Sequence, residues 1–453
     1  MTDATVAGGA EKPAKSPTSL LAKDERTAKR NAAEKRFQMY GAIAILIGLA
    51  FLVVLLVSIV RNGIPAFTQT FLEVDITLDA EALDPNGNRD PADLRKVSTF
   101  GYQPLVQQAI LDKVLALNVE TPFETPADMR ALYSAGSPAQ VRDTVIANPD
   151  LIGETIKFRL VASSRVDGYM KGRVTRESIA RDRNISAEHL DLVDAMEVQG
   201  TLKRTFNTDF IFGADASESR PEQAGIGVAM VGSLFMMFVV LGLALPIGVA
   251  ASIYLEEFAP KNRFTDLIEV NISNLAAVPS IVFGILGLAV FIQFAKLPQS
   301  APLVGGLVLT LMTLPTIIIS TRASLKAVPP SIREAALGVG ASKMQTVFHH
   351  VLPLAAPGIL TGTIIGLAQA LGETAPLLLI GMVGFIASNY PDGIAAGFLS
   401  PNSAMPAQIY EWSKRADPAY YERAWGGIII LLMFLMTMNI IAIILRRRFE
   451  RRW

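Results

Sequence analysis

The sequence predicts an all-α polytopic membrane protein into which an α+β domain is inserted. Of its 453 residues, 51% are hydrophobic and only 18% are charged, whereas soluble domains usually carry about 25% charged residues. Six apolar runs are long enough to cross a bilayer, which takes about 20 residues of helix. A polar stretch, residues 62–224, separates the first run from the other five and is long enough to bury a modest core.

The six predicted spans differ in how continuous they are. The second, fourth and sixth runs are the clearest. Polar residues intrude into the third and fifth runs, so the sequence does not fix where these two spans end. The interrupting residues are Pro279 in the third run, Pro315 in the fourth, and Pro357, Glu373 and Pro376 in the fifth. The runs cover residues 37–60, 226–254, 267–294, 302–321, 354–383 and 425–445.

Both ends of the chain are basic, which predicts the orientation. The first run is preceded by KDERTAKRNAAEKR and the last is followed by RRRFERRW. Lysine and arginine beside a span favour the cytoplasmic side, so both termini are expected there, and six spans satisfy this parity. We expect residues 1–36 to form a disordered basic tail, residues 37–61 to be a retained signal anchor, and residues 446–453 to be a second basic tail.

Residues 62–224, called the inserted domain below, are then predicted to lie outside the membrane. They contain 25 Asp and Glu against 17 Lys and Arg, a balance that suits translocation. Period-two alternation predicts strands within 71–79 and 154–163, and helical spacing predicts a helix within 104–119. Two short helices are expected within 175–196, where Ser186 and His189 form a loose capping pattern. The domain shows no catalytic motif; a solvated surface and a docking face for a partner are both open.

Composition excludes several kinds of chemistry. The chain has no cysteine and only three histidines, so disulfides and thiolate sites are excluded and an imidazole metal cluster is not expected. No GxxxxGK[ST] loop is present, so no nucleotide site is predicted in this chain. Neither a catalytic residue, a metal site, a cofactor nor a nucleic-acid surface is indicated, and the formal net charge is zero.

Residues 325–353 connect the fourth and fifth spans, on the cytoplasmic side by the predicted parity. They contain SIREAALGVGASKMQTVFHHVLP. Ser331 and Glu334 have the spacing of a capping box that starts a helix. Gly338 and Gly340 are poor helix formers and are expected to end it, Gly340 in a turn that a side chain would strain. Ser342 with Gln345 repeats the capping pattern before a second helix. By pattern alone this could be an interfacial loop or a docking helix.

The same residues carry a resemblance. Their spacing is similar to the coupling motif of permease subunits in ABC importers: EAA, three residues, G, nine residues, I, one residue, LP. His350 stands where that motif has Ile. The resemblance implies that the short helix, with Ser331, docks into a cleft on a separate cytoplasmic ATPase. The matching residues are Glu334, Ala335, Ala336, Gly340, Leu352 and Pro353.

Two further stretches narrow the resemblance to one family. NLAAVPSIVFGILGL begins at Asn274 and ALGETAPLLLIG begins at Ala370. Both resemble permeases of bacterial phosphate importers, and the GETAPL form is typical of the A subunit. Over residue 37 to the end, the resemblance implies a type I ABC importer core at 225–445 with five spans, in a bacterial inner membrane. It also implies partners: a second permease (PstC), an ATPase dimer (PstB) that binds ATP and Mg, and an outside phosphate-binding protein (PstS).

Intramembrane polar residues mark a transport path by default, and Glu373 is the first candidate. It is the only acid in the fifth run, followed by Thr374. It could instead pair with a base and hold two helices together. The family commonly has Arg four residues before this Glu, where this chain has Gln369, which puts the anion contacts in doubt.

Other candidates lie on the third and fourth spans. Hydroxyl residues at steps of three and four share one face of the fourth span, with Arg322 at its cytoplasmic end. Hydroxyls and a guanidinium can donate to phosphate oxygens; equally, the hydroxyls could bond to their own helix and the arginine could reach the interface. An asparagine pair on the third span could line the path or bridge helices. These residues are Thr313, Thr316, Ser320, Ser324, Asn271 and Asn274.

Other functions stay open at this point. A permease for sulfate or molybdate is the nearest alternative, because no residue reads the substrate directly. A membrane sensor with an outside domain is an alternative of another class, but it leaves four spans and the coupling motif unexplained. A secondary transporter would need no ATPase, yet no inverted repeat is visible.

Overall fold

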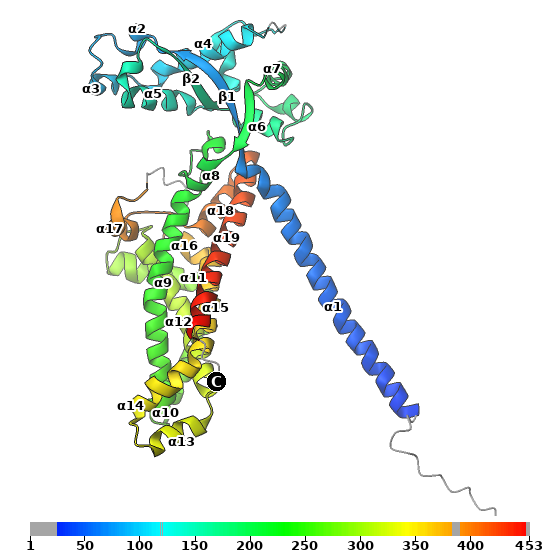
Figure 1. Cartoon of the computed structure of the whole chain (residues 1–453), viewed down its shortest axis with the longest axis vertical. Helices are drawn as coiled ribbons and strands as arrows, with labels where there is room; N and C mark the ends of the chain where they lie inside the picture. The colour runs from blue at the N-terminus through cyan, green and yellow to red at the C-terminus, as the bar shows by residue number, and fades with distance from the viewer. Residues whose placement is uncertain (1–24, 118, 120, 383–389, 450–453) are drawn as a thin grey trace, which may run out of the picture. The chain divides into compact units, whose positions relative to one another are not determined.

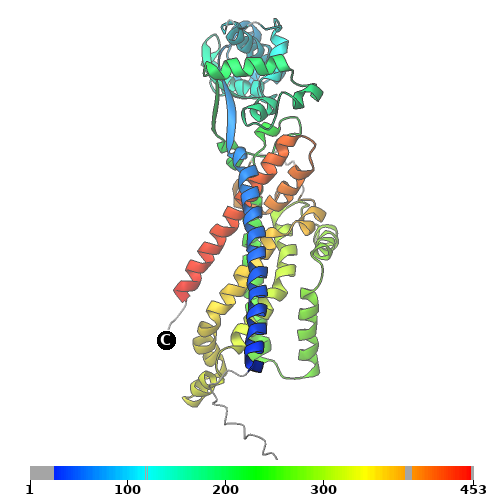
Figure 2. The same ribbon diagram turned by 90° about the vertical axis from the view of Figure 1, so that its right-hand side faces the viewer.

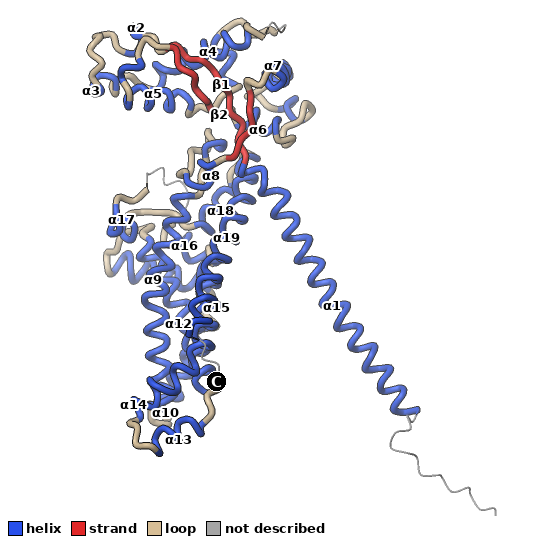
Figure 3. Tube along the Cα trace, in the orientation of Figure 1, coloured by secondary structure: helices blue, strands red, loops and turns tan. Residues whose placement is uncertain are grey.

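A computed structural model of the chain describes residues 25–117, 119, 121–382 and 390–449. The described elements are mostly helical, with one small sheet between the first two spans (Figure 1 and Figure 3). Residues 1–58 and 59–453 form two compact units. The second unit contains both the inserted domain and the later spans, and the helical spans with an inserted α+β domain confirm the predicted fold class.

Helix α1, Glu25–Gly63, carries the first apolar run. It begins before the apolar residues, so the predicted disordered tail over residues 1–36 is wrong for residues 25–36. This part is rich in Ala, Glu, Lys and Arg, which are good helix formers. Extending an existing helix also needs no new nucleus. The rest of the predicted tail, residues 1–24, lies outside the described residues.

A three-stranded antiparallel sheet with the order β2-β1-β3 organises the inserted domain. The two predicted strands are confirmed as β1, Thr68–Thr77, and β2, Thr155–Val161. The third strand, β3, Leu202–Phe206, pairs with the other edge of β1. It was not predicted because only Leu202 among its five residues is buried, so the alternation that marks a half-covered strand is absent.

The core of the inserted domain lies under one face of this sheet. Leu72, Val74 and Ile76 alternate along β1 and are fully buried, and α4, Thr99–Leu115, contacts the same strand. Helix α7, Ala187–Val198, starts with the capping box of Ser186 and His189. The smaller elements are α2 Ala80–Leu83, α3 Pro91–Leu94, η2 Pro126–Ala131, α5 Ser137–Ala147, η3 Pro149–Leu151, α6 Ser164–Met170, η4 Ser178–Arg181, α8 Thr208–Phe212 and η5 Pro221–Gln223.

Four continuous helices carry the other clear spans, and α12 is central because it packs on both α9 and α15. Small residues allow the close approach: a side chain at Gly306 would collide with Val239 of α9. The second, fourth and sixth predicted spans are confirmed. The helices are α9 Gly227–Ile253, α12 Pro302–Lys326, α15 Leu352–Gly372 and α19 Pro418–Phe449.

The third predicted span, residues 267–294, is not one helix. Helix α10, Arg263–Ala276, and helix α11, Ser280–Leu286, with its π-helical continuation η7, Gly287–Phe294, form a pair bent by 103°. Pro279 is the N-cap of α11. Proline disfavours the helical conformation of the residue before it, so the chain turns here.

The fifth predicted span ends earlier than residue 383. Helix α15 stops at Gly372 and a short helix, α16, Ala375–Leu379, follows after two non-helical residues. Residue 383 itself lies outside the described residues. Two more short helices, α17 Gly393–Leu399 and α18 Met405–Lys414, precede the last span.

The inserted domain and the connection from α12 to α15 lie at opposite ends of α9 (Figure 1), and the view turned by 90° shows the same two regions far apart (Figure 2). At the first end, the Gly227 amide donates to the Gly213 carbonyl, 2.9 Å away. At the other end α9 continues into the π-helical turn η6, Tyr254–Phe258, which binds the connection through Arg333. One rigid helix therefore joins the two regions.

Candidate functional site

The connection between α12 and α15 starts with helix α13, Pro330–Gly338. Pro329 occupies the N-cap position and no side chain caps the helix, so the predicted capping box of Ser331 and Glu334 is wrong. Proline at the first helical position is pre-organised for a helix and has no amide to satisfy, so Pro330 starts α13 two positions earlier than a box at Ser331 and Glu334 would.

The predicted glycine turn and second helix are confirmed. Gly340 has φ of +90°, a left-handed conformation that favours glycine. The Ser342 amide donates to Gln345 Oε1 at 2.9 Å and the Gln345 amide donates to Ser342 Oγ at 3.2 Å, which is a capping box. Helix α14, Lys343–Thr346, then runs through the π-helical turn η8, Val347–Val351, into α15.

Exposure divides the five coupling candidates. Ser331, Glu334, Ala335 and Gly340 are exposed, whereas Ala336 is buried against the protein. The exposed side also presents apolar side chains, with Leu337 at 49%, Val339 at 86% and Met344 at 59% exposure. This surface is small, partly apolar and not covered by the described part of the chain.

Arg333 anchors α13 and was missed from the sequence. Its Nη2 lies 2.7 Å from Glu257 Oε1 on η6. The same guanidinium donates to the Leu325 carbonyl near the end of α12, at 2.9 Å, and to the Val328 carbonyl just after that helix, at 2.8 Å. The only signal in the sequence is an arginine directly before the EAA residues, at a position that the motif does not specify. One side chain thus joins α13 to the ends of α9 and α12.

Arg322 does not present a free guanidinium. Its Nη2 lies 2.5 Å from Glu269 Oε1 of α10, and its Nε lies 3.4 Å from Glu256 Oε2 of η6. Lys326 lies 3.6 Å from the same Glu256 oxygen. In this conformation Arg322 holds α10 to α12, and an anion could bind it only after displacing a carboxylate.

The hydroxyl face of α12 bonds largely to its own helix. Thr313, Ser320 and Ser324 donate to carbonyls three or four residues earlier, at 2.8 to 3.1 Å. Ser320 and Ser324 also face Gly362 and Gly358 of α15, where an added methyl group would overlap them. Thr316 is half-buried. The hydroxyls therefore lie at the contact between α12 and α15.

The amide candidates lie apart from this contact. Asn271 is exposed and donates to the Leu267 carbonyl of its own helix at 2.7 Å. Asn274 is exposed near the end of α10, and Gln369 is exposed on α15. No described contact brings these three side chains together with the hydroxyl face.

Glu373 and Thr374 occupy the break between α15 and α16. Glu373 has extended backbone, both side chains are half-buried, and the described residues show no ion pair to Glu373. The break packs on the bent pair, because a side chain at Gly284 of α11 would collide with Pro376. Irregular backbone at membrane depth is tolerated where protein or a water-filled path covers it. Two interrupted helices meet here.

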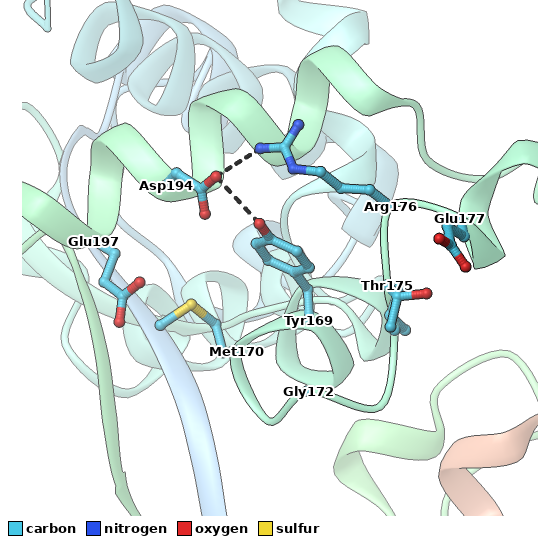
Figure 4. Close-up of a pocket in the computed structure, with 9 residues that line it drawn as sticks. Tyr169, Met170, Gly172, Thr175, Arg176, Glu177, Asp194 and Glu197 are labelled. Atoms are coloured by element: carbon cyan, nitrogen blue, oxygen red, sulfur yellow. Dashed lines mark hydrogen bonds and ion pairs between the residues drawn. The ribbon is translucent and has the colours of Figure 1, made fainter.

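The inserted domain contains a polar pocket of about 680 Å³ (Figure 4). Arg176 and the Tyr169 hydroxyl converge on Asp194, at 2.7 and 3.1 Å. A second carboxylate, Asp191, also binds Arg176 at 2.7 Å. The guanidinium is already neutralised, so the pocket offers no free cation, and nothing in it forms a nucleophile and base pair.

Comparison with known proteins identifies the chain as a permease component of a binding-protein-dependent transport system. The family described as "Binding-protein-dependent transport system inner membrane component" matches residues 244–453, and a domain of unknown function (DUF3333) matches residues 24–180. The PstA 1 phosphate transport permease of Mycobacterium tuberculosis is 32% identical over 228 residues, which is 50% of this chain and 72% of that protein. The chain belongs to this PstA family of phosphate transport permeases.

A second PstA protein is also similar to this chain. The PstA protein of Haemophilus influenzae is 29% identical over 220 residues, 48% of this chain and 74% of that protein. Among solved structures, an inward-facing MetNI methionine ABC transporter aligns with 49% of this chain and 94% of its own chain, at a TM-score of 0.38 and 17% identity. Similarity at that level assigns no conformational state.

Proposed function

We propose that this chain is one of two permease subunits in an ATP-driven phosphate importer and forms half of the path. The observation that carries the proposal is its membership of the PstA family, several of whose members are named as phosphate transport permeases. Those names favour phosphate over sulfate or molybdate. The exposed α13 surface supports a subunit that needs a partner, and this distinguishes it from a sensor or a secondary transporter.

In this proposal the exposed side of α13 is the ATPase contact. Ser331, Glu334, Ala335 and Gly340 supply small and polar groups, and Leu337 and Val339 supply apolar area. Ala336, which is buried, would instead pack α13 against the rest of the chain. The partner ATPase would bind ATP and Mg, a second permease would complete the path, and a binding protein would deliver phosphate. Both termini and α13 would then face the cytoplasm, and the inserted domain would lie outside.

The proposed path runs along the break at Glu373 and Thr374. This break has half-buried polar groups and an irregular backbone. The hydroxyls of α12 are less suited to line the path, because they bond largely to their own helix. Thr313, Thr316, Ser320, Asn271, Asn274 and Gln369 remain path candidates through a second conformation. Arg322 would contribute only if the motion released it from Glu256 and Glu269.

Reconstitution tests the proposal directly. The chain is co-expressed with the products of neighbouring genes, purified as a complex, and placed in vesicles with loaded binding protein. We expect phosphate-stimulated ATP hydrolysis and uptake of labelled phosphate, with sulfate as the matched control. Stimulation by sulfate but not phosphate would assign another oxyanion. A complex that forms without any ATPase would overturn the proposal.

The α13 contact has its own test. Glu334→Lys reverses an exposed charge on the proposed contact and should abolish uptake while the chain still inserts and folds. Lys261→Glu, an exposed charge reversal in the loop after η6, is the matched control and should keep uptake. Normal uptake by Glu334→Lys would remove the coupling role of this surface.

A further inference from the structure

A buried joint connects the inserted domain to the outer ends of α9 and α19. Its centre is Arg423 of α19, whose exposed fraction is 2%. The guanidinium donates to the Ala66 carbonyl at 3.0 Å, to Gln69 Oε1 at 2.7 Å and to the Glu222 carbonyl at 2.9 Å. It also lies over the Phe210 ring of α8. Arg423 therefore ties the start of β1, the segment before α9 and the start of α19 to one point.

Buried ion pairs reinforce the joint. Lys171, which follows α6, lies 2.7 Å from Glu422 of α19 and 2.6 Å from Asp167, and all three side chains are at most 7% exposed. Arg165 of α6 bridges Asp182 of its own domain to Asp417 beside α19. Breaking a buried pair leaves an uncompensated charge. Contacts of this kind fix one orientation between the inserted domain and α19.

Glu222 is the exception in this joint, because its carboxyl is buried and forms no ion pair among the described residues. The Ser134 hydroxyl is its hydrogen-bond partner, whereas Arg423 binds the backbone carbonyl of the same residue. Burial raises the pKa of Glu222 to about 7, although Ser134 and Arg423 oppose the rise. Protonation of this carboxyl therefore depends on whether the loop around Ser134 stays packed against the segment before α9, an arrangement called the seated state below.

Several charged groups line the cleft around Glu222, but no contact among the described residues pairs its carboxyl with a base. The cleft, of about 840 Å³, lies between residues 99–189 of the inserted domain and the last residues of that domain before α9, 217–222. Of the bases there, Arg165 is paired with acids and Arg220 donates to Ser217 Oγ. The charged and titratable groups that line the cleft with Glu222 are Asp128, Arg130, Arg165, His189, Glu218, Arg220 and Asp417.

We propose that the inserted domain is a positioning element of the permease, joined to the outer ends of α9 and α19 by Arg423 and Glu222, and that the joint is tightest when Glu222 carries its proton. The domain then holds the spacing of two span ends while α13 is moved at the other end. Only the transport measurement below rests on the proposed function.

The direction of the pH effect follows from the raised pKa. A carboxyl whose pKa is higher in the seated state stabilises seating fully below its ordinary value of 4.5 and loses that contribution as pH rises to about 7. Over this window the seating equilibrium should weaken on the order of a hundredfold. Glu222→Gln, which copies the neutral form, should remove this dependence.

Spin labels can measure the joint in the full chain. The protein has no cysteine, so Val198→Cys on the inserted domain and Tyr421→Cys on α19 label two unique, exposed positions. In lipid nanodiscs the distance distribution should be narrow at pH 5 and broaden by pH 8. Glu222→Gln should stay narrow, and Glu218→Gln, an exposed carboxyl in the same cleft, should behave like the parent. An unchanged parent distribution, or a Glu222→Gln variant that broadens like the parent, would overturn the proton-dependent joint.

Transport assays test whether the inserted domain positions the ends of the spans. In the reconstituted complex, Glu222→Gln should flatten the pH profile of uptake between pH 5 and 8. Arg423→Lys keeps the positive charge but loses the planar, forked guanidinium group. We expect this variant to lower the amount of phosphate taken up per ATP at least threefold. A purely structural role would lower the amount of complex and leave that ratio and the pH profile unchanged, which would contradict the proposal. If the substrate proves not to be phosphate, the spin-label result still decides the joint.

Discussion

The guanidinium of Arg333 lies across the Glu257 carboxylate, with its Nη2 2.7 Å from Oε1 and its Nε 3.2 Å from the same oxygen. Glu257 is 8% exposed at its side chain. Because Arg333 also binds the Leu325 carbonyl of α12 and the Val328 carbonyl just after it, it ties α13 to the ends of both α9 and α12. The pair is thus the mechanical attachment of α13.

Removing the Arg333 fork should uncouple the subunit. Arg333→Gln leaves Glu257 without its base, a loss of about 2 kcal/mol for hydrogen bonds to a charged group, and frees α13 from two helix ends. We expect uptake to fall at least tenfold while the ATPase still binds. Uptake and pull-down of the ATPase measure this, with Lys261→Gln as the control; unchanged uptake would contradict the attachment role.

Two glycines in α13 and its turn should respond oppositely to alanine. Neither has any atom near an added Cβ, so only backbone conformation matters. Gly340 has positive φ, and Gly340→Ala should cost about 1–2 kcal/mol in the turn and reduce uptake. Gly338 is helical, and Gly338→Ala should stabilise α13 by about 0.5–1 kcal/mol. Thermal unfolding and uptake measure both; equal effects would show that the turn conformation is unimportant.

The contact between α12 and α15 should depend on Gly362. Gly362→Ala places a methyl group on Ser320 and should lower thermal stability, whereas Gly366→Ala meets its nearest atom at 3.5 Å, an ordinary contact. Combining Gly362→Ala with Ser320→Gly should recover part of the loss, since the colliding side chain is gone. Melting of the purified chain in detergent measures all three. A Gly362→Ala chain as stable as the parent would mean that these helices are not packed this closely.

Neutralising Glu373 should separate transport from assembly. The described residues give this carboxyl no ion pair, so Glu373→Gln keeps its volume and breaks no salt bridge with that part of the chain. We expect phosphate uptake to fall at least tenfold while the complex purifies with normal composition. Loss of the second permease from the purified complex would instead indicate that Glu373 pairs with a base on that subunit.

Sequence patterns foresaw the parts of this fold that depend on local physics. The long apolar runs, the alternating strand β1 and the glycine turn at Gly340 are all properties of neighbouring residues. The 103° bend and the early end of α15 were not foreseen, because an apolar composition does not report direction. The start of α13 was misplaced because Pro330 and the Ser331 box compete for one helix end, and proline at the first position needs no capping side chain.

The candidate site was harder to predict from the sequence than the fold. Residue type suggested that Arg322 and the α12 hydroxyls could meet an anion, yet Arg322 is paired with Glu269, 53 residues earlier, and Ser320 packs against Gly362 of another helix. The role of Arg333 could not be predicted for the same reason, because its partner Glu257 lies 76 residues earlier in the sequence. Polar residues in a membrane helix are recognisable from sequence, but whether another helix already uses them is a property of the packed structure.

The uninterrupted helix from Lys343 to Gly372 has a geometric consequence. Thirty residues of helix form a rod about 45 Å long, with the Gly340 turn just before one end and Glu373 just after the other. If such a rod tilts by about 5°, its far end shifts by about 4 Å, which exceeds the diameter of a water molecule. A small rotation at the end that an ATPase would bind would therefore be enough to open or close a constriction at the opposite end. No residue between the two ends would need to change its conformation.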